Sequence, residues 1–431
     1  MSSIHFLPYP DPSHVGATFG IAKALERRGH KVRYLAPLDF QEVITSQGLD
    51  AMPICEDILP KGSFMISREL FASKMVEFKL FQMICKGELD DMIARVKPEL
   101  LVVDSYAQHM ALIGYKVGIP TLLLSPTLPR VRDRWVPPLT EPLVPKSPLS
   151  KLKVRLSWWE YDLFRLYLRS RGVQDPLCRI ALSANYPLAQ IDTRGFFPVL
   201  KLIPELILCP EVFDLPRSRI QNFLHYVGAY TDLRKKESAD FPWENVSPDK
   251  PLVYCALGTL SHRFREARSF LQTVISAVAA RPDLQLVVSI GNHLSIDDFG
   301  AATPNIILVN RAPQIEILKR ADVMITHGGL NSVKECILLG VPMIVFPWSR
   351  PVNAVRVAYH GLGLMGDVKK ISARQIQSMI DTVLKDRSFR TRTESMRKRF
   401  IEADHSDLGV KAMELVLSAR STMVLLKNRL G

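Results

Sequence analysis

Apolar and amphipathic segments alternate along the whole chain, beginning at the N-terminus. Residues 4–7 form an apolar run that predicts a strand, residues 15–28 have the hydrophobic spacing of a helix, and residues 31–36 are apolar again. Gly29 stands where the helix would end, since glycine tolerates the left-handed backbone of a helix terminus. A strand, a helix and a second strand in this order predict a parallel sheet of the doubly wound type, because parallel strands need a crossover connection.

A second set of segments repeats this pattern after residue 250. Residues 232–250 are charged, contain proline and have no hydrophobic period, which indicates a linker between domains. With 431 residues the chain is too long for one compact core. We therefore expect an α/β protein with an N-terminal domain, 1–231, and a second doubly wound domain, 251–402. Strands of the second domain are expected at 252–257, 284–290, 306–309, 323–326 and 343–346.

The junction after residue 326 has the features of an anion site. The apolar strand 323–326 runs through His327-Gly328-Gly329 straight into an amphipathic segment. Glycines after a strand let the backbone come close to a ligand, and the first free N–H groups of the following helix point at any negative charge there.

Polar side chains in that helix extend the prediction to a nucleotide. Asn331 and Ser332 stand in the first turn, where they can donate hydrogen bonds to phosphate oxygens. Glu335 lies one turn further along the same face, where a carboxylate would repel phosphate but can accept hydrogen bonds from a ribose diol. Together these residues predict a site for a nucleoside diphosphate.

The region 311–363 resembles the donor-binding signature of the family 1 glycosyltransferases, which are inverting enzymes of GT-B fold that use nucleotide sugars. The run Ala-Pro-Gln at 312–314 matches the part of that signature that holds the base, and 327–335 matches the part that holds diphosphate and ribose. The match is specific, because it fixes many positions over about fifty residues and agrees with the predicted local structure.

Other parts of the chain resemble the bacterial branch of this family, which includes zeaxanthin and macrolide glycosyltransferases. The runs Ser-His-Val at 13–15, Phe-Asp-Leu-Pro-Arg at 213–217 and Tyr-Val-Gly at 226–228 carry this likeness. The resemblance implies two Rossmann-like domains that face each other across a cleft, with a C-terminal helix, 403–431 here, returning to the first domain. It also implies a nucleotide-sugar donor, with UDP as the expected nucleotide. The implied donor-binding residues are Gly258, Thr259, Gly291, Arg311, Ala312, Gln314, His327, Gly328, Gly329, Asn331, Ser332, Glu335, Ser349 and Arg350.

Two departures from the family signature concern the base and the sugar. Arg311 stands where plant enzymes of the family have a stacking tryptophan, and a guanidinium plane can also lie against a base. Ser349-Arg350 replaces the Asp-Gln pair that holds sugar hydroxyls in the family. Arg350 either pairs with a carboxylate on a uronic-acid donor or is a solvated or phosphate-facing residue, and the sequence leaves both alternatives open.

A histidine and an aspartate are the candidate catalytic residues. His14 lies where the first strand gives way to a helix, at the carboxyl end of the sheet, and Asp104 ends a later strand at the same edge. A near-neutral imidazole can take the proton of an acceptor hydroxyl as its oxygen attacks the anomeric carbon, and that single displacement inverts the configuration. In the family, the matching aspartate orients the imidazole.

The acceptor is expected to be a hydrophobic or aromatic small molecule such as a polyketide, an isoprenoid or a lipid. Residues 64–96 are rich in Phe, Met and Leu and either line a pocket for such a molecule or form ordinary packed core. Two other functions stay open: a sugar-nucleotide epimerase of the same architecture, and a nucleotide-sugar-binding protein without catalysis. No metal cofactor is expected, because the sequence has no Asp-x-Asp triplet and no His/Cys cluster of ligand spacing.

The net charge of +13 suggests nucleic acid as a partner, but the motifs that bind nucleic acid are missing from the sequence. The excess is local: residues 130–171 hold ten basic and four acidic side chains, interleaved with aromatic residues. Residues 151–171 either rest as an amphipathic helix on an anionic bilayer or form a surface helix of the acceptor domain with its rings in the core.

The remaining composition favours a cytoplasmic protein, either free or associated with the inner face of the membrane. The six cysteines are widely separated, and their positions suggest buried thiols in a reducing compartment. No signal peptide and no window of about 18 apolar residues is found.

Overall fold

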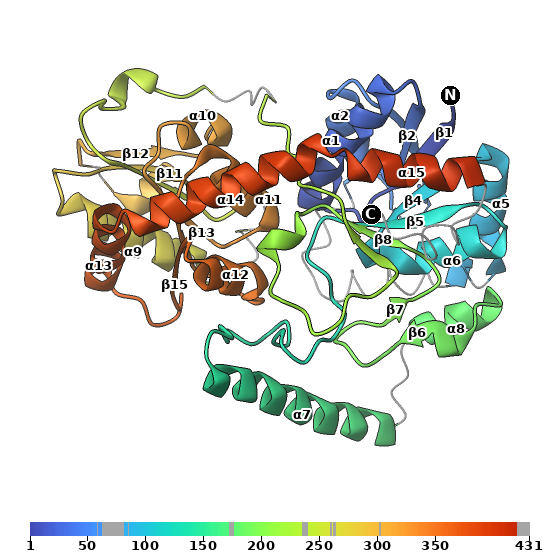
Figure 1. Cartoon of the computed structure of the whole chain (residues 1–431). Helices are drawn as coiled ribbons and strands as arrows, with labels where there is room; N and C mark the ends of the chain where they lie inside the picture. Colours follow the sequence, from blue (N-terminus) through green and yellow to red (C-terminus); the bar gives the residue numbers. More distant parts are fainter. Residues whose placement is uncertain are drawn as a thin grey trace.

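The chain forms two parallel sheets, one in each of two domains that lie side by side, and long helices near its C-terminus run across both, as the computed structural model in Figure 1 shows. The structure describes residues 1–57, 59–62, 82–84, 86–171, 176–234, 240–258, 261, 264–300 and 303–419. The first sheet has seven strands in the order β3-β2-β1-β4-β5-β8-β9, and the second has six in the order β12-β11-β10-β13-β14-β15. The predicted fold of two doubly wound domains is confirmed.

Both faces of the first sheet are covered. Along β4 (Leu100–Asp104) the side chains alternate between two cores. Leu100 and Val102 face the core that includes α1 and α15, and Leu101 and Val103 face the core that includes α6 and α8. The other strands are β1 (Ser3–Leu7), β2 (Lys31–Ala36), β3 (Asp50–Pro53), β5 (Thr121–Ser125), β8 (Glu205–Ile207) and β9 (Leu224–Tyr226). A small antiparallel pair, β6 (Ile191–Asp192) and β7 (Val199–Leu200), lies outside the sheet. The helices are α1 (Pro12–Arg27), α2 (Leu38–Thr45), α5 (Glu88–Val96), α6 (Gln108–Lys116), α7 (Pro148–Ser170) and α8 (Pro176–Ser183).

The second sheet is built in the same way, and its predicted strands are present. They are β10 (Leu252–Ala256), β11 (Gln285–Ser289), β12 (Ile306–Val309), β13 (Val323–Thr326) and β14 (Met343–Val345). The sixth strand, β15 (Gly363–Met365), was not predicted. The helices around it are α9 (Ala267–Ala279), α10 (Gln314–Leu318), α11 (Leu330–Leu339), α12 (Val352–His360) and α13 (Ala373–Lys385). All strand pairs of this sheet are parallel.

The start of α1 differs from the prediction. The helix begins at Pro12 rather than near residue 15, because the Asp11 side chain accepts a hydrogen bond from the Ser13 N–H at 2.8 Å and proline fits the first helical position. His14 therefore lies in the first turn of α1 and not in the preceding loop. The short strands β3, β8 and β9 were not predicted, and most of the segment 64–96 lies outside the described residues.

The chain returns to the first domain through α14 (Ser388–His405) and α15 (Leu408–Ala419), which run across both domains in Figure 1. The Asp404 carboxylate accepts hydrogen bonds from the backbone of Ala229 at 2.5 Å and of Tyr230 at 3.3 Å. Val410 and Met413 of α15 are buried in the core on one face of the first sheet. α15 is thus part of the first domain.

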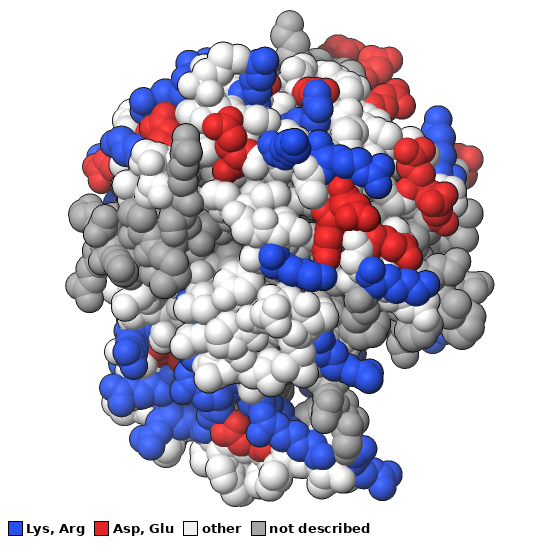
Figure 2. All heavy atoms as spheres, turned by 90° about the vertical axis from the view of Figure 1, so that its right-hand side faces the viewer, with Lys and Arg blue, Asp and Glu red and all other residues white. Residues whose placement is uncertain are grey.

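One face of α7 attaches this helix to the first domain. Trp158 is buried and its indole N–H donates to the Val136 carbonyl at 2.8 Å, and the Tyr161 hydroxyl donates to the Gly195 carbonyl at 3.1 Å. The helix predicted at 151–171 is therefore present. Figure 2 shows Lys and Arg side chains gathered in the lower part of the molecule, where Figure 1 places α7.

Three further expectations concern cysteines, metals and membrane spans. The five cysteines in the described part of the chain are free thiols. Among the described residues no group of three or more His, Cys, Asp and Glu side chains is placed to hold a metal ion. In the same residues no helix combines the length and the apolar character that crossing a bilayer requires.

Candidate functional site

His14 and Asp104 meet at the carboxyl edge of the first sheet. β1 and β4 are parallel neighbours with Leu7 opposite Val103, so the residues that follow them reach the same edge. The distance from His14 Nδ1 to Asp104 Oδ2 is 2.8 Å. The other carboxylate oxygen of Asp104 accepts the Tyr106 N–H at 2.8 Å, which fixes the carboxylate plane. The predicted contact between the two side chains is confirmed.

The surroundings of His14 favour its protonated form. Burial alone lowers the pKa of the imidazole, because only 13% of its side chain is exposed. The charge and the hydrogen bond of Asp104 raise the pKa by more, and Asp11 adds to that effect while Arg130 opposes it. The net result is a His14 pKa above its ordinary value of 6.5.

Aromatic rings surround His14, and none of them is among the predicted site residues. The ring centroid of Tyr106 lies 4.8 Å from that of His14, and the Tyr9 centroid lies 5.4 Å away. Phe197 continues this surface at 6.1 Å from Tyr106. The Arg130 guanidinium lies over both Tyr106, at 4.5 Å, and Phe197, at 5.0 Å. Tyr106 follows Asp104 closely and could have been found from that position, whereas nothing in the sequence indicates Phe197.

The glycines of the second domain make room for His327. Gly258 follows β10 with a φ of +79°, and a Cβ there would come within 2.5 Å of the His327 Cε1 atom. A Cβ at Gly329 would lie 2.8 Å from His327 Nε2. Gly328 has a φ of +84°, and a Cβ on it would meet Val345 at 2.5 Å. All three positions therefore require glycine: Gly328 and Gly329 where the strand turns into α11, and Gly258 beside the buried imidazole.

His327 itself is held neutral by its surroundings. Burial lowers its pKa to about 4. Its Nδ1 atom is buried and has no hydrogen-bond partner among the described residues. His327 belongs to the run that the family resemblance assigns to the diphosphate and ribose; at neutral pH it can bind an anion only as an N–H donor and not as a cation.

The start of α11 presents donors for an anion. The helix begins at Leu330, so the backbone N–H groups of 330–332 have no partner inside it. Gln314 joins the two signature runs, because its amide donates to Glu335 at 2.5 Å and to the Ser332 hydroxyl at 3.2 Å. The predicted phosphate and ribose residues thus lie together on one surface of the second domain.

The remaining predicted donor residues lie on the loops after neighbouring strands. Gly291 follows β11 with a φ of +84°, and Arg311 and Ala312 lie between β12 and α10. The Arg311 side chain is exposed and Ala312 is half-buried. Thr259 lies outside the described residues.

Two hydrogen bonds connect the predicted nucleotide-sugar site of the second domain with the first domain. The Asn331 amide donates to the Ser13 carbonyl at 2.9 Å, next to His14. Arg350 donates to the Tyr106 hydroxyl at 3.3 Å, and its guanidinium lies 5.2 Å from the Phe197 ring centroid. Ser349 is exposed beside it. Arg350 therefore rests on the rings around His14 and is not surrounded by water alone.

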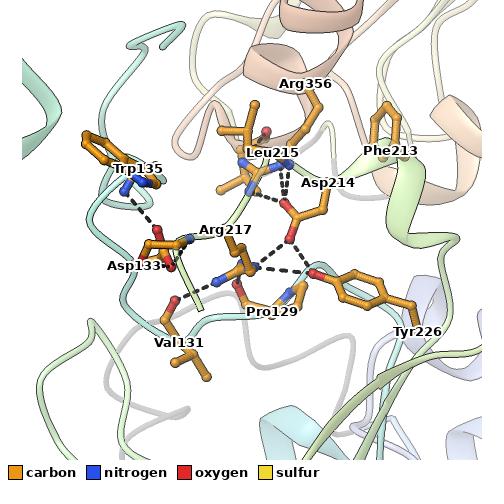
Figure 3. A network of polar contacts seen from close by, with 12 residues as sticks. Pro129, Val131, Asp133, Trp135, Phe213, Asp214, Leu215, Arg217, Tyr226 and Arg356 are labelled. Atoms are coloured by element: carbon orange, nitrogen blue, oxygen red, sulfur yellow. Dashed lines mark hydrogen bonds and ion pairs between the residues drawn. The ribbon is translucent and has the colours of Figure 1, made fainter. Parts of the chain in front are cut away.

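A buried network joins the domains behind this site (Figure 3). One Asp214 oxygen accepts from Arg356 of α12 at 2.6 and 3.0 Å, and the other accepts from Arg217 at 2.8 Å and from Tyr226 at 2.5 Å. Burial alone would raise the pKa of Asp214, but the two guanidinium groups hold it well below its usual value. The carboxylate is therefore ionised and ties α12 to the first domain.

A buried lysine adds a second connection. Lys334 of α11 is 2% exposed, and its amine donates to the carbonyls of Leu208 at 3.1 Å and Ala229 at 2.9 Å in the first domain. Burial lowers the pKa of this amine. The helix whose first turn offers N–H groups to an anion is therefore fixed to the first domain one turn later.

Sequence comparison finds similar proteins among the glycosyltransferases that modify natural products. Residues 273–406 match the family model described as "Erythromycin biosynthesis protein CIII-like, C-terminal domain". The chain is 25% identical over 398 residues to zeaxanthin glucosyltransferase of Pantoea ananas, which covers 88% of this chain and 89% of that protein. It is 22% identical to demethyllactenocin mycarosyltransferase of Streptomyces fradiae, over 97% of this chain and 87% of that protein.

The fold is also that of solved glycosyltransferases. The structure of the kitacinnamycin glycosyltransferase superimposes with a TM-score of 0.68, at 20% identity, over 97% of this chain and 99% of that one. The two-domain arrangement of the present chain is therefore the GT-B architecture.

Proposed function

We propose that this chain, a glycosyltransferase of GT-B fold and family 1 type, moves a sugar from a nucleoside diphosphate to a hydroxyl of a hydrophobic acceptor with inversion at the anomeric carbon. The observation that carries the proposal is the position of the His14–Asp104 pair, whose 2.8 Å contact lies beside the Asn331–Ser13 hydrogen bond. A potential base in one domain thus borders the predicted diphosphate site of the other.

In this proposal the second domain binds the nucleotide sugar. The N–H groups of 330–332 and the Asn331 amide face the diphosphate, and the neutral His327 adds one more N–H. Glu335 accepts from the ribose hydroxyls, and Gln314, which already contacts Glu335, lies beside it. A bound donor has to replace the Asn331–Ser13 contact, which is a single neutral hydrogen bond.

The first domain supplies the proton acceptor. With its Nδ1–H directed to Asp104, the neutral imidazole presents Nε2 as the acceptor of the hydroxyl proton. The hydroxyl oxygen then bonds to the anomeric carbon as the bond to the diphosphate breaks, and Asp104 stabilises the resulting imidazolium. The N–H groups at the start of α11 stabilise the negative charge of the departing nucleoside diphosphate. A single displacement of this kind inverts the sugar.

The rings around His14 favour an apolar or aromatic acceptor. Tyr9, Tyr106 and Phe197 offer flat, largely apolar surfaces close to the imidazole. UDP is the first nucleotide to test, with thymidine diphosphate next, because Arg311 leaves the choice of base open. The reaction needs no metal ion in this scheme. The free thiols suit a reducing compartment, so we assign the enzyme to the cytoplasm.

Replacing His14 by Ala tests the base. Turnover should fall by roughly 10²–10⁴-fold, the usual contribution of a general base, while the dissociation constant for the nucleotide stays within about twofold. His30→Ala is the matched control, because His30 contacts Glu414 of the returning helix at 3.4 Å and should leave turnover unchanged. Wild-type turnover in His14→Ala would reject the assignment.

The same experiment separates the other two functions. An epimerase would convert the nucleotide sugar in the absence of any acceptor, which is detected by chromatography of the donor. A binding protein would bind nucleotide tightly but consume no donor across a broad acceptor panel. Acceptor-dependent loss of donor that requires His14 excludes both.

The pH profile tests the pairing with Asp104. The pKa of His14 is raised above 6.5, so kcat/KM should increase with pH until the imidazole loses its proton, and the midpoint should lie above 6.5. Asp104→Asn removes the largest raising influence while burial persists, so the midpoint should move to lower pH. A midpoint that is the same in both proteins would contradict the proposed role of Asp104.

A further inference from the structure

The outer face of α7 exposes a stripe of large apolar side chains. Eight of the seventeen large hydrophobic residues that are exposed in the described part of the chain belong to this one helix, each between 47% and 66% exposed. They are Leu149, Leu152, Leu156, Trp159, Leu163, Phe164, Leu166 and Tyr167. So large a continuous apolar surface is unusual on a protein that contacts only water.

The stripe is not the side by which α7 packs on the domain. Val154 and Trp158 are buried, and with Tyr161 they recur at helical spacing along the inner side. The exposed positions 152, 156, 159 and 163 recur at the same spacing along the opposite side. The helix therefore has two apolar faces, of which the first domain covers one.

Positive charge borders the exposed stripe. α7 carries five basic and two acidic residues, and Lys151, Arg155 and Arg169 lie on the flank between the two apolar faces. Next to this flank is a hollow of about 470 Å³ whose walls hold five arginines and one acidic residue. The arginines are Arg132, Arg134, Arg155, Arg194 and Arg219. The basic side chains in the lower part of Figure 2 belong to the same part of the molecule as α7.

We propose that α7 docks this protein on an anionic phospholipid bilayer, with the leucine and aromatic stripe in the acyl boundary and the flanking arginines and lysines at the lipid phosphates. An interfacial helix needs these two features together, an apolar side and a basic border. Trp159 and Tyr167 suit the headgroup level, because their rings are amphipathic.

The charges favour a bilayer over a second copy of this chain. Two α7 helices that paired through their stripes would bring two basic borders and two arginine-lined hollows close to one another, and like charges repel. The stripe is also wide, since Phe164 and Leu166 lie on its two edges, whereas a helix pair buries a narrow seam.

Ring contacts connect α7 with the candidate base. Tyr161 of α7 stacks on Phe196 at 5.9 Å, Phe196 contacts Phe197 at 5.1 Å, and Phe197 contacts Tyr106, whose ring borders His14. These rings lie on the side of α7 that faces the domain, so an apolar acceptor that passes from the bilayer around the edge of α7 would meet aromatic surface that leads to His14. This last step rests on the proposed function, whereas the docking itself does not.

Co-sedimentation of the full chain with vesicles tests the docking. The protein should sediment with vesicles of phosphatidylglycerol and phosphatidylcholine in equal parts, bind phosphatidylcholine alone much more weakly, and be released by high salt. The double variant Leu156→Glu/Trp159→Glu should bind at least tenfold more weakly, because the stripe would carry two charges into the acyl boundary. The control variant is Val43→Glu. Val43 is an exposed residue of α2, which lies at the opposite side of the domain from α7, so this variant should bind vesicles as the wild type does.

A second variant addresses the charges without changing the stripe. Lys151→Gln/Arg155→Gln should weaken binding by about fivefold for each cation removed and should reduce the dependence on salt. His14→Ala should bind vesicles normally, so loss of transfer and loss of docking are distinguishable. The stripe variant should keep its transfer rate on a water-soluble acceptor and lose rate only on an acceptor dissolved in vesicles.

Three results would overturn the proposal. The wild type could stay in the supernatant with the anionic vesicles, or the stripe variant could sediment as the wild type does. Light scattering could instead show a wild-type dimer that Leu156→Glu/Trp159→Glu converts to a monomer, which would make the stripe an interface between two copies.

Discussion

Asp214 and Arg356 join the two domains through several hydrogen bonds that are shielded from water. Asn331 and Arg350 instead each reach the first domain through one hydrogen bond, and their side chains are more accessible. The first contact region also contains Lys334, which is 2% exposed and donates to two carbonyls of the first domain. The second region borders His14. Both regions connect the same two domains, but they differ in burial and in charge.

The difference indicates which side of the domain interface is fixed. Removing one partner of a buried ion pair leaves an uncompensated charge away from water, and this is costly. Breaking a single neutral hydrogen bond at a wetter position costs little, because water replaces the lost partner. The Asp214 side should therefore stay closed while the contacts at Asn331 and Arg350 open and re-form around ligands.

The largest effect is expected for Asp214→Ala. This change leaves Arg217 and Arg356 buried without their shared carboxylate, and the free energy of unfolding should fall by about 3–5 kcal/mol. Urea denaturation followed by circular dichroism measures the change. Asp50→Ala is the matched control, because Asp50 pairs with Arg33 at the surface and its removal should cost less than about 1 kcal/mol. Equal losses in the two variants would contradict the proposed difference between the contact regions.

A smaller effect on stability, with a clear effect on donor binding, is expected for Asn331→Ala. The free energy of unfolding should change by less than about 1 kcal/mol, since one neutral hydrogen bond is lost. Affinity for the nucleotide sugar should fall by about 10–100-fold, because a hydrogen bond to a charged phosphate is stronger than one to a carbonyl. Isothermal titration calorimetry measures this affinity.

Gln377→Ala provides the control for that experiment. Gln377 makes one comparable contact, from its amide to the Ala277 carbonyl at 2.8 Å, inside the second domain. Its replacement should alter stability to a similar small extent and leave nucleotide affinity unchanged. If Asn331→Ala lowered the free energy of unfolding as much as Asp214→Ala does, the contact region beside His14 would be as firmly fixed as the region around Asp214.

The sequence predicts the parts of the site that depend on local pattern. The strands 306–309 and 323–326 are found at the expected bounds, because buried parallel strands appear as continuous apolar runs. The contact between His14 and Asp104 was predictable for the same reason, since both follow strands that end at one edge of a parallel sheet. Glycine positions likewise indicated the turn around His327.

Long-range partners could not be predicted in this way. Asp214 and Arg356 are 142 positions apart, and neither local sequence signals the other. Lys334 lies inside the donor signature, yet its burial depends on how the second domain meets the first. The segment 151–171 was ambiguous because α7 has two apolar faces, so its periodicity indicated a helix without showing which side is covered.

The smallest effect is expected for Arg350→Gln, and it distinguishes the two interpretations of this residue. Arg350→Gln removes a hydrogen bond to Tyr106 and cation–ring contacts with Phe196 and Phe197, and an exposed contact of the latter kind is worth about 0.5–1 kcal/mol. These contacts join the two domains, so KM for a neutral hexose donor should change by less than about fivefold. If Arg350 pairs with a uronic-acid carboxylate, KM for that donor alone should rise by roughly a further tenfold, because a charged hydrogen bond is lost. Arg134→Gln, which removes a similar cation 4.8 Å from the Trp135 ring, should affect neither donor. An equal change for neutral and acidic donors would leave Arg350 as a contact between the domains and not a selector of the sugar.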